Sequence, residues 1–452
     1  MTGTENTAVG HFALGNGLVT GNNNVAVGRN AMLHSTSTAG SVAIGSEALG
    51  GGVTTGGNNI AVGAGAGKDI TSGSKNVLVG SQAGTNLISG HSNTAIGHES
   101  LTTEDARAGA TAVGYRALKL QNSDENSFNT AMGYDAGLSI TQGINNALIG
   151  AYAGNAMVTD SRITAVGHKA LTSQVTSFTV GGGAYNNDPT ITHTSSSVIK
   201  TGQKVTGTGV NGFVGSITSA TVFELTDIDG TAANTTGGNL SGQTLTFSGG
   251  VQANTALGHA AGETLTTSIN STLIGYRAGE SITLADNNTA VGAFAGKEIT
   301  TGISNTIIGG LAGDALTTGS GSVAIGQNAL SSTTVGSDNI AIGRDALTIN
   351  VNGSSSVAIG TLALQDQAPT GTGNTYNIAI GHHAGRDIST SVNNTIIGGL
   401  AGDAINTGSH NTVLGQSALT NTTVGAENVS IGASAMFTNV GGTASVAIGK
   451  NA

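Results

Sequence analysis

The sequence predicts an all-β protein: a parallel β-solenoid, or β-roll, of about 22 turns of 17 residues, with one small antiparallel β domain inserted. Three observations predict this class. The phrase Asn-Thr-Ala-Val-Gly at residues 6–10 returns in variant form through the whole chain. Most of its copies are 17 residues apart, and Gly supplies 74 of the 452 residues. Dense Gly, Asn, Thr and Ser oppose a helix, and a fixed short period is typical of stacked turns.

The closing glycine of each copy marks the period. Ten such glycines lie in residues 1–172 and twelve in residues 252–452, whereas Gly167 and Gly258 are 91 residues apart. These positions predict two solenoid segments and an inserted domain at 173–251. We expect each closing glycine to adopt a bend that a β-carbon forbids. Representative positions are Gly10, Gly45, Gly97, Gly150, Gly275, Gly326, Gly398 and Gly449.

The residues before the glycine predict a short strand. The residue directly before it is Val, Ile, Leu or Met in every copy, preceded usually by Ala and then by Thr, Val or Ile. Alternation places the large apolar side chain on one face and the small one on the other. The small residue predicts close packing on its face. Four residues before the glycine, fifteen copies have Asn, which we expect to stack along the solenoid axis.

The residues after the glycine predict a second wall. The third is Ala in all copies but one, which has Ser100. The fourth is Leu or Met in eleven copies and Gly in ten, and those ten have an aliphatic residue three positions later, such as Ile70 or Leu87. Each turn therefore supplies one aliphatic side chain by one of two routes, as a continuous packed core requires.

The insertion differs in composition and contains four of the eight Phe residues. Alternating runs, such as 221–225 and 243–247, predict a compact β domain. Function tends to lie on segments inserted in a rigid scaffold. We therefore predict receptor binding, to a sugar for example, by Tyr185, Asn186, Asn187 and Asp188. The alternative is that the Phe residues fill the domain core and Tyr185 marks a turn.

Charge and motif content argue against several other functions. The net charge is −10 and there is no basic cluster, so no nucleic-acid surface is expected. The sequence contains no run of 18 apolar residues, so we expect no helix inserted in a membrane. The pair Asp124 and Glu125 has no evident catalytic partner. Asp227 and Asp229 lack the further acidic ligands of a calcium loop. We expect no enzyme, and no catalytic, cofactor or metal site.

Five copies place His after the glycine, and if that site faced a three-fold axis, three imidazoles could hold a metal or an anion. These residues are His11, His98, His168, His259 and His382. Because other copies have Tyr, Arg, Ser, Ala or Gln there, the pattern favours a generic exposed position.

Some repeats have a familial likeness. Ser-Val-Ala-Ile-Gly occurs at 41–45, 322–326, 356–360 and 445–449, and it resembles the head repeat of trimeric autotransporter adhesins. The variant Gly-Tyr-Arg-Ala at 114–117 and 275–278 looks like repeats of bacteriophage tail fibres. The resemblance covers about 375 residues. It implies a homotrimer of parallel β-rolls about a common axis, and we expect the small-residue strand face to lie between subunits.

The resemblance implies a structural or adhesive fibre of a phage virion, a tail fibre or another virion fibre, whose rigid shaft presents a host-recognition module. Its expected partners are its own copies, other virion or fibre proteins at the ends, and a host-surface glycan or protein. The first alternative is an adhesin head on a bacterial surface. No export signal follows Met1, which favours the phage if the chain is complete. A polysaccharide-degrading tailspike is the second alternative.

Overall fold

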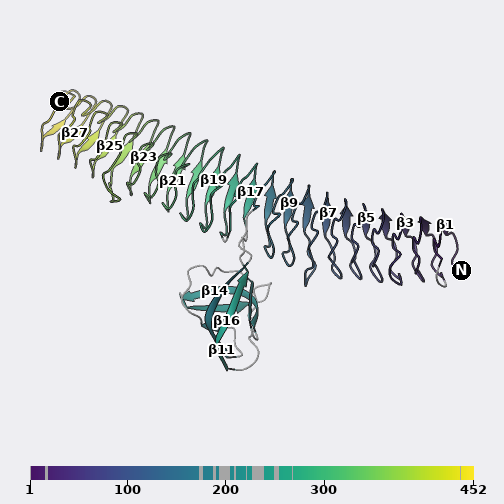
Figure 1. Cartoon of the computed structure of the whole chain (residues 1–452). Coiled ribbons are helices and arrows are strands. Elements are labelled where there is room, and N and C mark those ends of the chain that lie inside the picture. The colour runs from purple at the N-terminus through teal and green to yellow at the C-terminus, as the bar shows by residue number, and fades with distance from the viewer. Residues whose placement is uncertain are drawn as a thin grey trace. The chain divides into compact units, whose positions relative to one another are not determined.

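The computed structural model describes residues 2–15, 19–172, 177–186, 190–192, 204–207, 210–219, 221–226, 239–248, 254–266, 268–437 and 439–452. These residues form 28 β-strands and no α-helix. They divide into two compact units, residues 1–254 and 255–452. Each unit contains a run of three-residue parallel strands, one per turn, and the first also contains an antiparallel barrel (Figure 1). The predicted all-β solenoid with a small antiparallel sheet is confirmed.

The strands of the two runs are short and evenly spaced. In the first unit they are β1 (Thr7–Val9), β2 (Val25–Val27), β3 (Val42–Ile44), β4 (Ile60–Val62), β5 (Val77–Val79), β6 (Thr94–Ile96), β7 (Thr111–Val113), β8 (Thr130–Met132), β9 (Ala147–Ile149) and β10 (Thr164–Val166). In the second they are β17 (Thr255–Leu257), β18 (Thr272–Ile274), β19 (Thr289–Val291), β20 (Thr306–Ile308), β21 (Val323–Ile325), β22 (Ile340–Ile342), β23 (Val357–Ile359), β24 (Ile378–Ile380), β25 (Thr395–Ile397), β26 (Thr412–Leu414), β27 (Val429–Ile431) and β28 (Val446–Ile448). Equivalent residues of successive turns pair without a register shift, as in Val25–Val42–Ile60.

The core of each run is filled as the two-route pattern predicts. Leu49 and Leu118 are fully buried in turns of the Leu type, and Ile70 and Leu87 are fully buried in turns of the Gly type. A β-carbon on Gly67 would lie 3.0 Å from Ile70 Cδ1, so the glycine leaves the space that the later side chain fills. The packed core supplied by one aliphatic side chain per turn is therefore confirmed.

Strand centres follow the same compensation. Five turns have Leu or Ile in place of Ala at the middle of the strand, and all five are of the Gly type. These larger residues are Leu78, Leu148, Leu273, Ile307 and Ile396, and each is fully buried. The absent side chain at the glycine makes room for the larger strand residue, since a close-packed interior tolerates neither a void nor an overlap.

One expectation about the strand faces is wrong. From β2 to β10 and from β17 to β27 the middle residue, usually Ala, is buried inside the chain's own core. It therefore cannot lie between subunits. The large residue before the glycine points outward instead, and Ile44 is 40% exposed although Ala43 is fully buried. The small side chain is needed because the interior is already filled from the second wall.

The closing glycines have the predicted special conformation. Their φ angles run from 126° to 145°, a region that L side chains rarely adopt. At Gly97 a β-carbon would lie 2.2 Å from the carbonyl oxygen of Gly114, the equivalent glycine of the next turn. The eight glycines singled out from the sequence all have this conformation.

The predicted Asn stack is also confirmed. Asn59 and Asn76 are fully buried. The amide of Asn76 donates through Nδ2 to Asn59 Oδ1 (3.1 Å) and to the carbonyl oxygen of Gly90 (2.8 Å), and its backbone N–H donates to Asn59 Oδ1 (3.0 Å). One side chain thus satisfies backbone groups on two neighbouring turns, which a buried loop requires.

The inserted segment contains a closed barrel of six antiparallel strands. They are β11 (Ser177–Asn186), β12 (Thr190–Thr192), β13 (Lys204–Gly207), β14 (Val210–Ser219), β15 (Val222–Thr226) and β16 (Asn239–Ser248), in the order β11-β12-β15-β14-β13-β16. Its buried core is Ile191, Val205, Val210, Val214, Phe223, Leu225 and Leu245. Phe223 is thus a core residue, as the structural alternative for the insertion expected.

Candidate functional site

The outward face of the strands is the most distinctive surface of the two runs. Strand side chains alternate in direction, so the buried middle residue leaves the first and third residues pointing outward. Both outward columns contain only Val, Ile, Leu, Met, Ala and Thr. We call the surface formed by these first and third residues the strand face.

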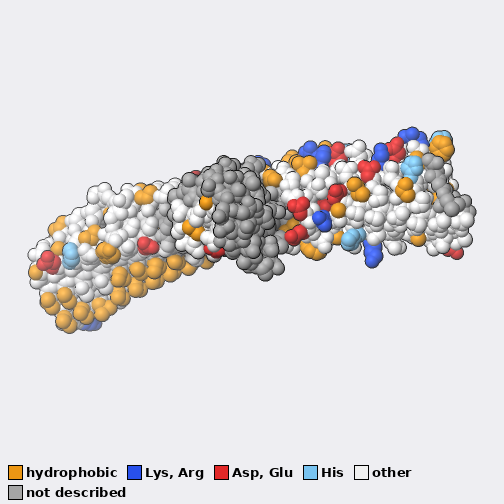
Figure 2. Space-filling view, turned by 90° about the horizontal axis from the view of Figure 1, so that it is seen from below, with side chains coloured by type: hydrophobic (Ala, Val, Ile, Leu, Met, Phe, Trp, Pro, Cys, Tyr) orange, Lys and Arg blue, Asp and Glu red, His pale blue; other side chains and the backbone are white. Residues whose placement is uncertain are grey.

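The strand face is apolar and open to solvent. Met132, Leu257 and Leu414 in its third column are 46–47% exposed. Figure 2 shows hydrophobic side chains lined up in a continuous band on the run 255–452, as one aliphatic residue per turn requires. A three-residue strand is about 10 Å long and twelve turns rise about 58 Å, so this strip covers about 580 Å². That is as large as the largest apolar patch on a typical monomer.

The sequence contained a signal for this arrangement. Asn at four residues before the glycine and Ala at two residues before it have the same parity, and both were expected to be packed closely. The third column therefore points the other way, and the structure shows that this direction is outside the solenoid. The face has no charged residue, so covering it incurs no desolvation of an ion.

A second exposed feature is an aromatic column in the first unit. Ring centroids are 5.4 Å apart between His98 and Tyr115, 4.9 Å between Tyr115 and Tyr134, 5.4 Å between Tyr134 and Tyr152, and 6.0 Å between Tyr152 and His168. The first two pairs are stacked. The rings cover one another's faces along the axis, an arrangement that stabilises adjacent turns.

Charged side chains beside this column pair with one another. Arg116 donates from Nε and Nη2 to the two carboxylate oxygens of Asp135 at 2.8 and 2.6 Å, which raises the pKa of Arg116. Lys119 Nζ donates to Glu99 Oε2 at 2.6 Å and lowers the pKa of that carboxyl. These charges serve contacts between turns.

The histidines after the glycine fit this same pattern. His98 and His259 stack on Tyr115 and Tyr276 of the following turns, at 5.4 and 5.2 Å between centroids. His382 stacks on its neighbour His383, whose pKa is lowered by burial and by His382. No group of three His, Cys, Asp or Glu among the described residues could hold a metal ion.

The residues predicted to bind a receptor are only partly within the described structure. Tyr185 and Asn186 lie at the end of β11, where they pair with Leu240 and Asn239 of β16. Asn187 and Asp188 lie outside the described residues, as do the side chains of Tyr185 and Asn186. Receptor binding by this cluster stays a prediction. Asp227 and Asp229 also lie outside the described residues.

The structure reveals a buried carboxyl that the sequence did not single out. Glu104 is fully buried, and it accepts hydrogen bonds from Gln121 Nε2 (2.9 Å) and from the backbone N–H of Arg107 (3.3 Å). Burial raises the pKa of Glu104. It occupies the position that an aliphatic residue fills in turns of the Gly type. Asp124, by contrast, has its backbone N–H bonded to Gln142 Oε1 in an exposed turn.

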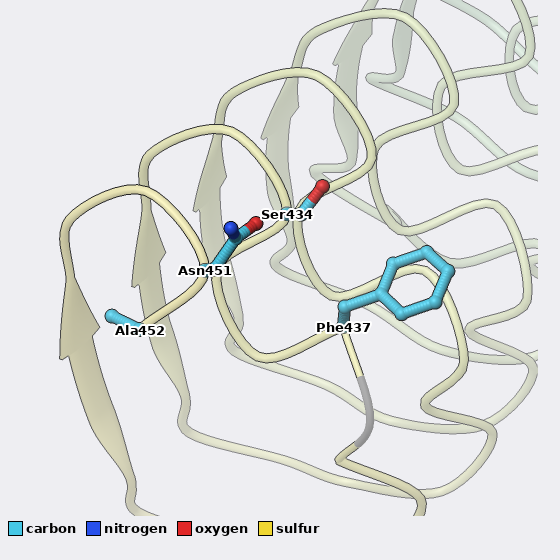
Figure 3. A pocket seen from close by; sticks show the side chains of 4 residues that line it. All are labelled: Ser434, Phe437, Asn451 and Ala452. Carbon is cyan, nitrogen blue, oxygen red and sulfur yellow. The ribbon is translucent and has the colours of Figure 1, made fainter.

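A pocket near the last turns has a lining without ionisable side chains. It is lined by Ser434, Phe437, Asn451 and Ala452, and Figure 3 shows these residues on neighbouring turns of the second run. None has an ionisable side chain, so no acid–base pair is assembled there.

Comparisons with protein-family models and with curated proteins found no match to this chain. Among the described residues no helix is long and apolar enough to cross a membrane. The strand face, with its large uncharged surface outside a completed core, is therefore the candidate functional site.

Proposed function

We propose that the chain is the shaft of a homotrimeric phage fibre, in which three copies pack through their strand faces and present the inserted barrel to a host surface. The observation that supports the proposal is the uncharged strand face, whose third column is aliphatic in every turn. Such a face is expected of a subunit in an assembly, because large apolar patches on soluble monomers are rare.

The interior of each run makes no use of these outward residues. Leu118, Ile140 and their equivalents fill the core from the second wall, and the strand centre fills it from the first. By strand geometry the strip of ten turns covers about 480 Å² and the strip of twelve turns about 580 Å², compared with the ~800 Å² that each partner buries in a standard interface. Burial of apolar surface contributes about 25 cal/mol per Å², so covering the strips would offset a considerable entropic cost of association.

The number of copies and the biological setting come from the resemblance of the repeats. A trimeric adhesin head on a bacterial surface would use the same face, and it is the alternative proposal. In either setting the partners are other copies of the chain, further fibre proteins at the ends, and a glycan or protein on the host. A polysaccharide-degrading tailspike is the third proposal; two of the described carboxylates, Glu99 and Asp135, are paired with cations between turns.

The first test is the native mass by light scattering. Three times the chain mass is expected, and a monomer at micromolar concentration would refute the assembly. Ile308→Asp with Ile342→Asp should convert the trimer to monomers, since each copy would bury two carboxylates. Thr301→Asp, at an exposed bend outside the strand face, is the matched control and should leave the mass unchanged. Mass spectrometry of purified virions from a lysate then separates phage from adhesin.

A further inference from the structure

The first column of the strand face changes residue type in blocks. In the first unit β2 to β5 begin with Val25, Val42, Ile60 and Val77, whereas β6 to β10 begin with Thr94, Thr111, Thr130, Ala147 and Thr164. In the second unit the order is Thr255, Thr272, Thr289 and Thr306; Val323, Ile340, Val357 and Ile378; Thr395 and Thr412; then Val429 and Val446. The third column is aliphatic throughout.

The hydroxyls of these Thr blocks are free to meet a partner. None of the Thr side chains in these blocks of the two runs makes a hydrogen bond within the described part of the chain. Thr111 and Thr289 are half-buried, so they lie at the surface rather than in the core. Elsewhere in the turns many Thr hydroxyls do bond backbone carbonyls, as Thr283 does to Thr300.

When the strand face is covered by another copy, the free energy of burying each hydroxyl depends on the side chain that it contacts. A buried hydroxyl that faces an aliphatic side chain loses its hydrogen bond to water without a replacement. A hydroxyl that faces another hydroxyl can donate or accept. Copies related by rotation about an axis parallel to the solenoid bring the same residue to the same height. Thr then meets Thr, and Val or Ile meets its like.

Other alignments break this matching. A shift of four turns in the second unit would set all four Thr of the first block against Val323, Ile340, Val357 and Ile378. A shift of one turn would mismatch the three block boundaries. Because the blocks of that unit have lengths of four, four, two and two turns, no shift other than zero matches them all.

We propose that the Thr blocks determine the register in which copies of this chain associate. They favour a parallel, unshifted alignment by leaving hydroxyls unpaired in every other one. The proposal rests on the association of strand faces proposed above, and it adds the residues that select one alignment. The third column, aliphatic in every turn, provides adhesion but no register.

Single cysteines test the register, because the chain has no Cys. Thr289→Cys and Val357→Cys lie four turns, about 19 Å, apart along the face. The two variants, carrying tags of different size, are co-expressed and treated with a thiol cross-linker shorter than that distance. Cross-links within each variant are expected, and cross-links between the two variants at less than one tenth of that yield. Thr301→Cys, at an exposed bend, measures cross-linking by random collision.

The first Thr block of the second unit is then removed by Thr255→Val, Thr272→Val and Thr306→Val. Val is a residue that other turns already have at this position. In that background cross-links between the two variants should rise at least fivefold while the native mass stays the same. Assemblies that cross-link equally between variants with the Thr blocks intact would overturn the register proposal. A monomeric mass without specific cross-links would instead refute the association on which it rests.

Discussion

The closing glycines provide the sharpest test of the fold, and Gly398→Ala is the clearest case. Gly398 has φ of 140°, and a β-carbon there would lie 2.4 Å from the carbonyl oxygen and 2.6 Å from the carbonyl carbon of Gly415. Both atoms belong to the backbone of the next turn, so no side chain can move aside. The matched control is Gly399→Ala, where the added carbon would have nothing within 4 Å.

The expected cost has two parts. A non-glycine residue held in a sparsely populated backbone region costs about 1–3 kcal/mol. Forcing an extra carbon into close-packed surroundings costs about 1–3 kcal/mol more. We therefore expect Gly398→Ala to lower the free energy of unfolding of its turns by about 2–6 kcal/mol. Gly399→Ala should change it by less than about 0.5 kcal/mol, as other surface substitutions do.

Amide hydrogen exchange is the suitable assay, because stacked repeats open locally and do not unfold in one step. The N–H of Gly415 donates to the carbonyl oxygen of Ile397 at 2.8 Å, next to the substitution, and so reports on opening there. Its exchange should accelerate at least tenfold in Gly398→Ala and stay near that of the parent in Gly399→Ala. Equal exchange in the two variants would refute the steric argument.

Three further predictions concern the interior. Asn394→Ala leaves the carbonyl oxygen of Gly408 and the N–H of Asn411 without their partner. It should lower the local free energy of opening, measured by amide exchange, by about 2–4 kcal/mol, and Asn394→Ser should lower it less. An unchanged exchange rate of the Asn411 amide would contradict this. Gly296→Leu overpacks the core against Ile299, whereas Ile299→Thr leaves a void. The double variant should therefore be more stable than the sum of the two single changes predicts. A double-mutant cycle of urea unfolding measures this difference. Burial raises the pKa of Glu104, so the folded state holds its proton more tightly; the stability from this group is complete below about pH 4.5 and declines as the pH rises through the folded pKa. Glu104→Gln should flatten that decline in urea unfolding, and an unaltered pH profile would exclude the buried carboxyl as its cause.

The repeat alone predicted most of the solenoid. A strict period places equivalent residues of every turn above one another. A side-chain size that recurs in nearly every turn, such as Ala three residues after the glycine, therefore already indicates a packed position. Some turns fill the core with one Leu, such as Leu49, and others combine Gly67 with Ile70. This alternation could be recognised from the sequence as core filling, because the side-chain volume per turn must stay constant. The Asn stack followed from the same reasoning.

The direction of the strand faces was decided only by tertiary structure. Alternation shows that two faces differ, but not which one the second wall covers. Because Leu49 and Ile70 already fill the interior, the strand centres of their turns are the small residues Ala43 and Ala61, and Ile44 is turned outward. The sequence by itself thus determined the turns, the bends and the core. The closure of each turn on itself decided which apolar residues remain outside, since side-chain volume leaves no room for both columns within.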